Sequence, residues 1–132
     1  VNGMKRLLEY VKTRNQVKLL AILFNCSEPE AITRALERIR EDSSLRHELT
    51  ERGILLGAYA NRLTPVDPDW TMESSDGPQP MRNDLSPQEY YDKFVVKWIN
   101  DMNVQIIGGC CGITPEHISY IRSKIQKQPS SL

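Results

Sequence analysis

The chain has 132 residues, and its 17 Lys and Arg side chains balance its 17 Asp and Glu side chains. Because non-specific nucleic-acid binders carry a basic excess, the neutral charge argues against nucleic acid as a partner. The longest apolar run has six residues, 19–24, whereas a membrane span needs about 18 or more, so we expect no membrane contact either.

The first half of the chain alternates helix and strand patterns. Apolar residues at helical spacing predict a helix over residues 4–14, and a nearly continuous apolar run predicts a strand buried on both faces over residues 17–24. Ser27 with Glu30 predicts a capping box for a helix over residues 28–41, and a further turn or two through residues 45–49 ends at Gly53. Residues 54–60 predict a second buried strand.

Residues 62–85 lack periodicity and contain four prolines. A segment of this kind is either a lid or binding loop or a tolerated surface insertion, and both interpretations stay open. Beyond it, Ser86 with Glu89 predicts a capped helix to about residue 101, residues 104–107 a short strand, and Thr114-Pro115 the start of a last helix. We expect residues 127–132 to be a polar tail.

This order of elements predicts an α/β fold with about three parallel strands and flanking helices. Chemistry-bearing residues follow each strand: Cys26 the first, Asn61 the second, and Cys110 and Cys111 the third. Because the carboxyl ends of parallel strands meet at one edge, we expect the thiols to gather there.

Three thiolates suit Zn²⁺ and leave its fourth position open, as in catalytic sites. Cys110 and Cys111 are adjacent, so both reach one ion only if the backbone bends, and the glycines around them supply that bend. Three unrelated buried thiols, or a disulfide between Cys110 and Cys111, are the alternatives. The odd number of cysteines argues against a secreted disulfide framework and favours the reducing cytoplasm.

Two segments carry a family resemblance: residues 24–30 (FNCSEPE) and residues 107–118 (IGGCCGITPEHI). Both resemble the homocysteine S-methyltransferase family, over residues 3–125 of this chain. The strand end Tyr59-Ala60-Asn61 resembles the family's Tyr-x-Asn, although Ala60 departs from its usual proline.

The resemblance implies a (βα)₈ TIM barrel, of which residues 1–126 form the C-terminal part of the homocysteine-binding domain, because a whole barrel takes about 250 residues. It implies that Cys26, Cys110 and Cys111 hold catalytic Zn²⁺. It also implies methyl transfer to the thiol of homocysteine, giving methionine. S-methylmethionine, S-adenosylmethionine, betaine, or methylfolate with cobalamin is the expected donor.

Four further residues are candidates for substrate binding: Asn25, Asn61, Gly108 and Gly109. For the two asparagines, a plain strand-end turn is the alternative. We expect the chain to need a partner, either the N-terminal half of the barrel or another copy in a homo-oligomer, and to be inactive alone. An inactive zinc-binding remnant or subunit, and a thiol redox protein using Cys110 and Cys111, remain alternative functions.

Overall fold

The computed structural model describes residues 1–14, 16–65, 69, 71 and 80–126. The predicted tail at 127–132 and most of the middle of the 62–85 segment lie outside these residues. No helix in the described part of the chain is long and apolar enough to cross a membrane.

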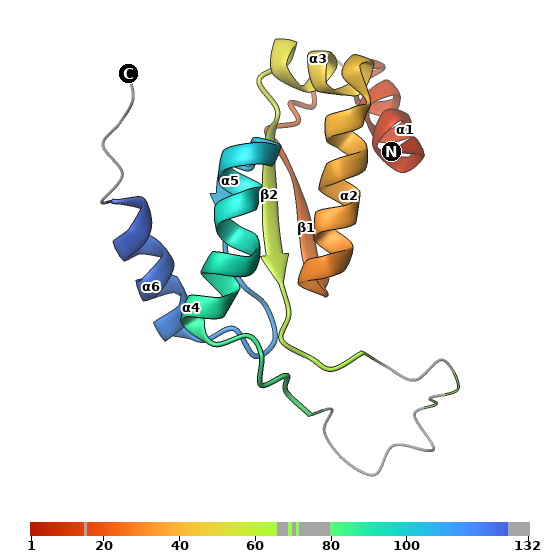
Figure 1. Cartoon of the computed structure of the whole chain (residues 1–132). Coiled ribbons are helices and arrows are strands. Elements are labelled where there is room, and N and C mark those ends of the chain that lie inside the picture. The colour runs from red at the N-terminus through yellow and green to blue at the C-terminus, as the bar shows by residue number, and fades with distance from the viewer. Residues whose placement is uncertain (15, 66–68, 70, 72–79, 127–132) are drawn as a thin grey trace.

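Three parallel strands form one sheet in the order β1-β2-β3, which confirms the α/β prediction. Strand β2 lies in the centre, and β1 and β3 pair with it on opposite sides (Figure 1). The strands are β1 (Ala21–Ser27), β2 (Leu55–Ala60) and β3 (Ile106–Ile107).

Helices precede, connect and follow the strands, as the alternation of patterns predicts. The 86–101 pattern is divided, because its second turn widens into a π-helical turn, η2 (Tyr91–Val95), between α4 and α5. The helices are α1 (Asn2–Lys12), α2 (Pro29–Glu41), α3 (Ser43–Glu51), α4 (Pro87–Tyr90), α5 (Val96–Met102) and α6 (Pro115–Ile125).

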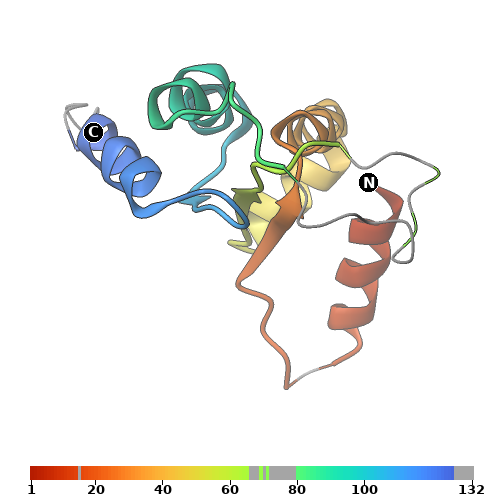
Figure 2. The same ribbon diagram turned by 90° about the horizontal axis from the view of Figure 1, so that it is seen from below.

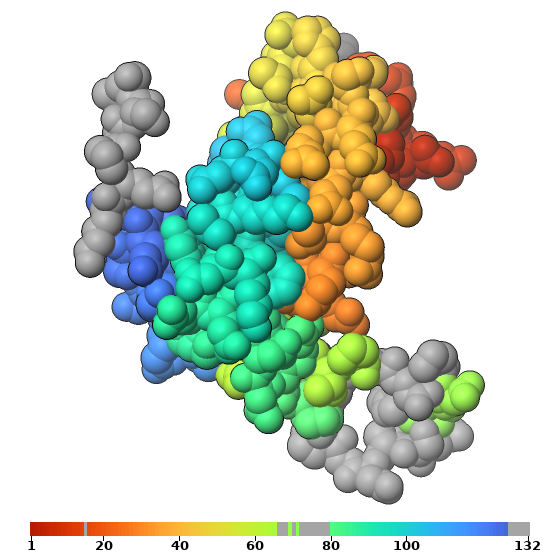
Figure 3. All heavy atoms as spheres, in the orientation of Figure 1, coloured from red at the N-terminus to blue at the C-terminus, as the bar shows by residue number. Residues whose placement is uncertain are grey.

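The hydrophobic core lies on one side of the sheet. Helices α2 and α5 both cover that side, and their side chains meet over the strands (Figures 2 and 3). Ala58 and Ala60 of β2 are completely buried there, together with Leu36 and Trp98 of the covering helices. The indole Nε1 of Trp98 donates a hydrogen bond to the Thr33 hydroxyl at 2.9 Å, so the one polar atom of this large side chain is satisfied.

The opposite face of the sheet is open, and this corrects the prediction of a strand buried on both faces at residues 17–24. The strand begins only at Ala21, and Leu23 on it is 39% exposed. Leu55 of β2, which pairs with Ala21, is 40% exposed on the same face, because Ala21 and Leu23 lie two residues apart on β1. The physical reason is that the helices cover only one face, so the side chains of Ile22 and Phe24 are half-buried under them, whereas Leu23 between them is exposed.

The helix starts were predicted correctly, but one of the three predicted caps was wrong. Ser86 caps α4 in a capping box with Glu89, and α6 begins after Thr114. Ser27, in contrast, does not cap α2, because it remains paired in β1 and its hydroxyl donates to the Asn25 carbonyl at 3.2 Å. Helix α2 instead begins after Glu28, without a side-chain cap.

Candidate metal centre

The three thiols gather at the carboxyl edge of the sheet. The sulfur of Cys111 lies 3.7 Å from that of Cys26 and 3.8 Å from that of Cys110. All three sulfurs lie within 4.8 Å of one another. Cys26 and Cys111 are exposed and Cys110 is half-buried, and in the described chain none of them forms a disulfide. The predicted convergence of the strand ends therefore brings all three cysteines together.

A β-bulge directs the thiol of Cys26 toward the other two. The pairing of β1 with β2 skips Cys26, since Asn25 pairs with Tyr59 and Ser27 with Ala60. Cys26 itself has a left-handed backbone with φ +48°. Bulges of this kind change the direction of a side chain at the end of a strand, and a non-glycine residue pays for this conformation with about 1–2 kcal/mol.

The backbone after β3 turns so that adjacent cysteines share one site. The amide of Cys110 still donates to the Ala60 carbonyl at 2.8 Å, as a continuation of the sheet. The chain then reverses, with Ile113 N–H donating to the Cys110 carbonyl at 3.0 Å and Gly112 at φ +79°. The left-handed Gly112 lets the chain reverse directly after Cys111, and it is one of the glycines from which the sequence predicts a bend around the two thiols.

The spacing of the sulfurs fits one tetrahedral zinc ion. Zn–S bonds of about 2.3 Å at tetrahedral angles place the sulfurs about 3.8 Å apart. A disulfide joins its sulfurs at about 2.05 Å, roughly half the spacing observed between Cys110 and Cys111. The residues present therefore match the geometry and the soft donor set that zinc prefers.

The protonation of the cluster also favours a cation. Hydrogen bonds with the thiols of Cys110 and Cys111 lower the pKa of Cys26. The hydrogen bond with Cys26 in turn raises the pKa of Cys110 to about 11. A thiolate at Cys26 is thus stabilised by its neighbours, whereas a second thiolate at Cys110 is disfavoured unless a positive charge lies between the two sulfurs.

Asn61, which is predicted to bind substrate, stabilises the bulge at Cys26 through a hydrogen bond. The residue is 8% exposed, and its amide Nδ2 donates to the Cys26 carbonyl at 3.0 Å while its Oδ1 accepts from Leu63 N–H at 3.2 Å. Asn25, the other candidate asparagine, is exposed at the same edge of the sheet. Asn61 therefore orients a thiol-bearing residue, and Asn25 is accessible to a ligand.

At the two candidate glycines, Gly108 and Gly109, the backbone lies close to neighbouring side chains. A Cβ on Gly108 would lie 2.6 Å from the ring of Tyr59, and a Cβ on Gly109 would collide with Ile113. The carbonyl of Gly108 accepts a hydrogen bond from the Tyr90 hydroxyl at 3.1 Å. Tyr90 is fully buried and was not predicted as a site residue, because nothing near it in the sequence marks its partner.

His117 lies in the first turn of α6 and has a capping role. Its Nδ1 accepts from the backbone N–H of Thr114 at 3.1 Å, so Nε2 carries the hydrogen and donates to the Leu85 carbonyl at 2.9 Å. The ring thereby connects the start of α6 to Leu85, which precedes the cap of α4, and both ring nitrogens have hydrogen-bond partners.

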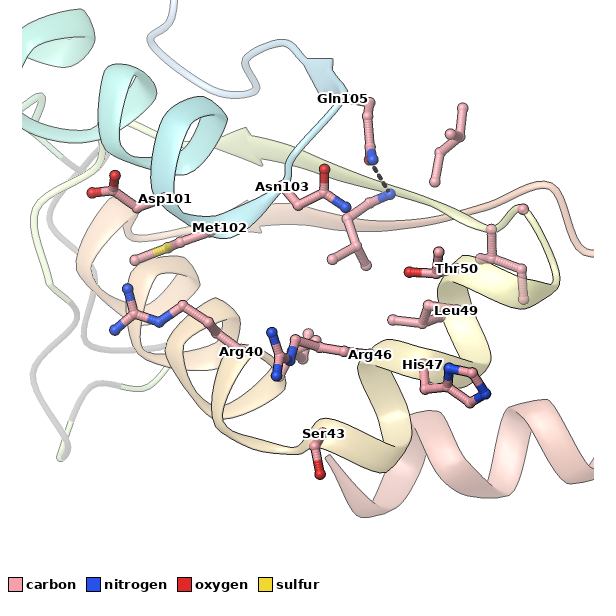
Figure 4. Close-up of a pocket in the computed structure, with 15 residues that line it drawn as sticks. Arg40, Ser43, Arg46, His47, Leu49, Thr50, Asp101, Met102, Asn103 and Gln105 are labelled. Carbon is pink, nitrogen blue, oxygen red and sulfur yellow. Dashed lines mark hydrogen bonds between the residues drawn. The ribbon is translucent and has the colours of Figure 1, made fainter.

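A pocket of about 630 Å³ lies at the other end of the sheet. It is lined from the end of α2, from α3 and from the end of α5, with Arg40, Arg46, Asp101 and Asn103 among its polar side chains (Figure 4). Leu55, at the start of β2, also lines it, whereas the thiols follow the strand ends. The pocket is therefore separate from the thiol cluster.

Comparison with known families gives one match. The family model described as homocysteine S-methyltransferase matches residues 4–125, which include all three cysteines. No solved structure matches the chain significantly.

Proposed function

The chain belongs to the homocysteine S-methyltransferase family, and we propose that it carries the zinc site of an enzyme that transfers a methyl group to the thiol of homocysteine, giving methionine. The observation that carries this proposal is the set of three free thiols with sulfur spacings of 3.7 and 3.8 Å. Cys26, Cys110 and Cys111 would hold the ion and leave one position for a fourth sulfur. Bound zinc would supply the acidity that makes a thiol a thiolate at neutral pH.

The methyl transfer itself is a simple displacement. After the homocysteine thiol loses its proton to solvent, its sulfur bonds to the methyl carbon as the bond from that carbon to the donor atom breaks. The donor atom keeps the electron pair of the broken bond. S-methylmethionine, S-adenosylmethionine, betaine, and methylfolate with cobalamin each present a methyl group on a nitrogen, sulfur or cobalt atom that can leave in this way.

The residues around the thiols divide between holding the site and contacting substrate. Asn61 shapes the site through its side-chain amide, which donates to the Cys26 carbonyl, and Gly108 through its carbonyl, which accepts from the Tyr90 hydroxyl. Asn25 and Gly109 are exposed at the same edge, so we assign them to contacts with homocysteine.

The open sheet supports the proposal that further strands complete a barrel. Within the described residues, β1 and β3 each pair on one side only, and the face that carries Leu23 and Leu55 is uncovered. Unpaired edges and exposed apolar faces favour association with other strands. We therefore propose that residues 1–126 act as the C-terminal part of a TIM barrel, completed by the N-terminal half or by a second copy. Since three free thiols persist in reducing compartments, we also propose a cytoplasmic location.

A methyl-transfer assay tests the function. This chain and a version with the complete barrel are each incubated with homocysteine and one methyl donor at a time, and methionine is measured. We expect turnover from the complete barrel, loss of turnover in its Cys26→Ala variant, and no turnover from this chain alone.

The outcomes separate the alternatives. A complete barrel that binds zinc but turns over no donor indicates a zinc-binding remnant. A metal-free protein that cycles a disulfide between Cys110 and Cys111 indicates a thiol redox protein. Turnover by this chain alone would contradict the half-barrel proposal.

A further inference from the structure

An arginine outside the strands is held at three of its nitrogen atoms close to the thiol cluster. Arg82 donates from Nη1 and Nη2 to the two carboxylate oxygens of Glu30, at 2.9 and 2.8 Å. Its Nε and Nη2 also donate to Asp84, at 3.0 and 2.9 Å. The Arg82 side chain is only 14% exposed, so water screens this two-pronged contact less than it screens an ordinary surface ion pair.

Glu30, one partner of Arg82, is connected to Cys26 along the chain. Glu30 lies in the first turn of α2, which follows β1 directly, and it is four residues beyond Cys26. A shift of Glu30 would therefore move the start of α2 and, with it, the strained bulge at Cys26. Both partners are charged at neutral pH, and the hydrogen bond from the Arg82 guanidinium holds the pKa of Glu30 below its ordinary value.

The backbone of Arg82 is connected to Cys111 through hydrogen bonds with Arg62. Arg82 N–H donates to the Arg62 carbonyl at 2.9 Å, and Arg62 Nε donates to the Arg82 carbonyl at 2.6 Å. The backbone N–H of Arg62 then donates to the Cys111 carbonyl at 2.8 Å. Leu63 and Met81 form an antiparallel bridge beside these bonds and keep the two segments in register.

A continuous path thus runs from Glu30 through Arg82 and Arg62 to the peptide of Cys111. We propose that Arg82 is a positioning residue, which fixes the segment carrying Cys111 against the segment carrying Cys26 and so sets the spacing of the thiols. The inference deepens the proposed function, since a metal that takes these thiols gains from a preset spacing. The effect of Arg82 on the spacing of the thiols is the same whichever metal they bind.

Two substitutions at this position are compared with a matched one elsewhere. Arg82→Gln removes both the positive charge and the paired guanidinium nitrogens that contact Glu30, whereas Arg82→Lys keeps only the positive charge. Arg52→Gln is the control, because Arg52 is also partly buried and ties α3 to α1 through the Leu8 carbonyl and Glu48. It lies in the turn before β2, away from the carboxyl edge of the sheet.

Zinc affinity is measured by competition with a coloured chelator, and the ligand geometry by the visible spectrum of the Co²⁺ form. We expect Arg82→Gln to bind zinc roughly 10- to 100-fold more weakly, as substitutions behind metal ligands do. Arg82→Lys should fall in between with a changed Co²⁺ spectrum, and Arg52→Gln should match the unmodified protein. Equal affinity and spectra for Arg82→Gln and Arg52→Gln, with equal loss of thermal stability, would show that Arg82 is only structural.

A metal-free measurement keeps the inference independent of zinc. In a Cys110→Ser background only Cys26 and Cys111 remain, and a reagent that fluoresces after linking two thiols reports their proximity. We expect linking to slow in Arg82→Gln and not in Arg52→Gln. If the unmodified protein binds no zinc but Arg82→Gln still slows linking, the proposed function fails and the positioning role stands. If Arg82→Gln does not fold, Asp84→Asn replaces it in both measurements, with a smaller expected effect, and an unchanged result there would overturn the role.

Discussion

Replacement of Asn61 by alanine should weaken both the thiol site and the fold. The substitution removes the hydrogen bond to the Cys26 carbonyl and the one from Leu63 N–H. Each is worth about 0.5–1.5 kcal/mol, so we expect a loss of roughly 1–3 kcal/mol in the free energy of unfolding. The left-handed backbone of Cys26 costs about 1–2 kcal/mol, which is comparable to what Asn61 contributes. Without Asn61, Cys26 can relax out of the bulge and turn its thiol away.

The assay combines urea unfolding of the metal-free protein with zinc competition. Zinc affinity should fall about 10- to 100-fold in Asn61→Ala. Asn61→Asp separates the two hydrogen bonds, because it keeps the acceptor for Leu63 N–H and places a carboxylate oxygen against the Cys26 carbonyl. We expect it to lose affinity as Asn61→Ala does.

Asn103→Ala is the matched control. Asn103 is an exposed asparagine that ends α5 in a left-handed conformation with φ +55°. Its replacement should cost about 1 kcal/mol of stability without any change in zinc affinity. The reasoning would be refuted if Asn61→Ala lost as much stability as Asn103→Ala and still bound zinc as tightly as the unmodified protein.

Three further predictions concern a glycine beside the thiol site and the ends of two helices. Gly108→Ala would bring a Cβ to 2.6 Å from the Tyr59 ring and should cost about 1–3 kcal/mol in urea unfolding, with weaker zinc binding; wild-type stability would show that the ring moves aside freely. The hydroxyl and amide of Ser86 lower the pKa of Glu89 from 4.5 to about 2, so its stabilising effect is present above pH 4.5 and lost as the pH falls toward 2. The difference in melting temperature between Glu89→Gln and the unmodified protein should therefore be large at neutral pH and vanish near pH 2, and a constant difference would disprove the link. Gly53→Ala places a side chain at φ +61° and should lower stability by about 1–2 kcal/mol, whereas an unchanged melting temperature would mean that α3 ends differently.

The sequence predicted that the cysteines lie at one edge of the sheet, because that placement follows from topology. Once three strands run parallel, their carboxyl ends share an edge, and residues 26, 110 and 111 all lie at it. The same reasoning could not find the bulge at Cys26. Its left-handed backbone depends on the register between β1 and β2 and on Asn61, which is 35 residues away.

Other features escaped prediction for related reasons. Ser27 has the sequence of a helix cap, but pairing with Ala60 keeps it in β1. The contact of Arg82 with Glu30 joins residues 52 positions apart, so no local pattern marks it. The apolar run at residues 17–24 was interpreted as a doubly buried strand, whereas the described chain covers only one face of β1.

The most direct test of the central claim is X-ray absorption spectroscopy at the zinc edge of the zinc-loaded protein. Cys26, Cys110 and Cys111 together predict three sulfur neighbours at about 2.3 Å. The number of sulfur neighbours should rise to four when homocysteine is added and fall to two in Cys26→Ala without homocysteine. Zinc surrounded only by nitrogen and oxygen, or a sulfur count that Cys26→Ala leaves unchanged, would contradict the account.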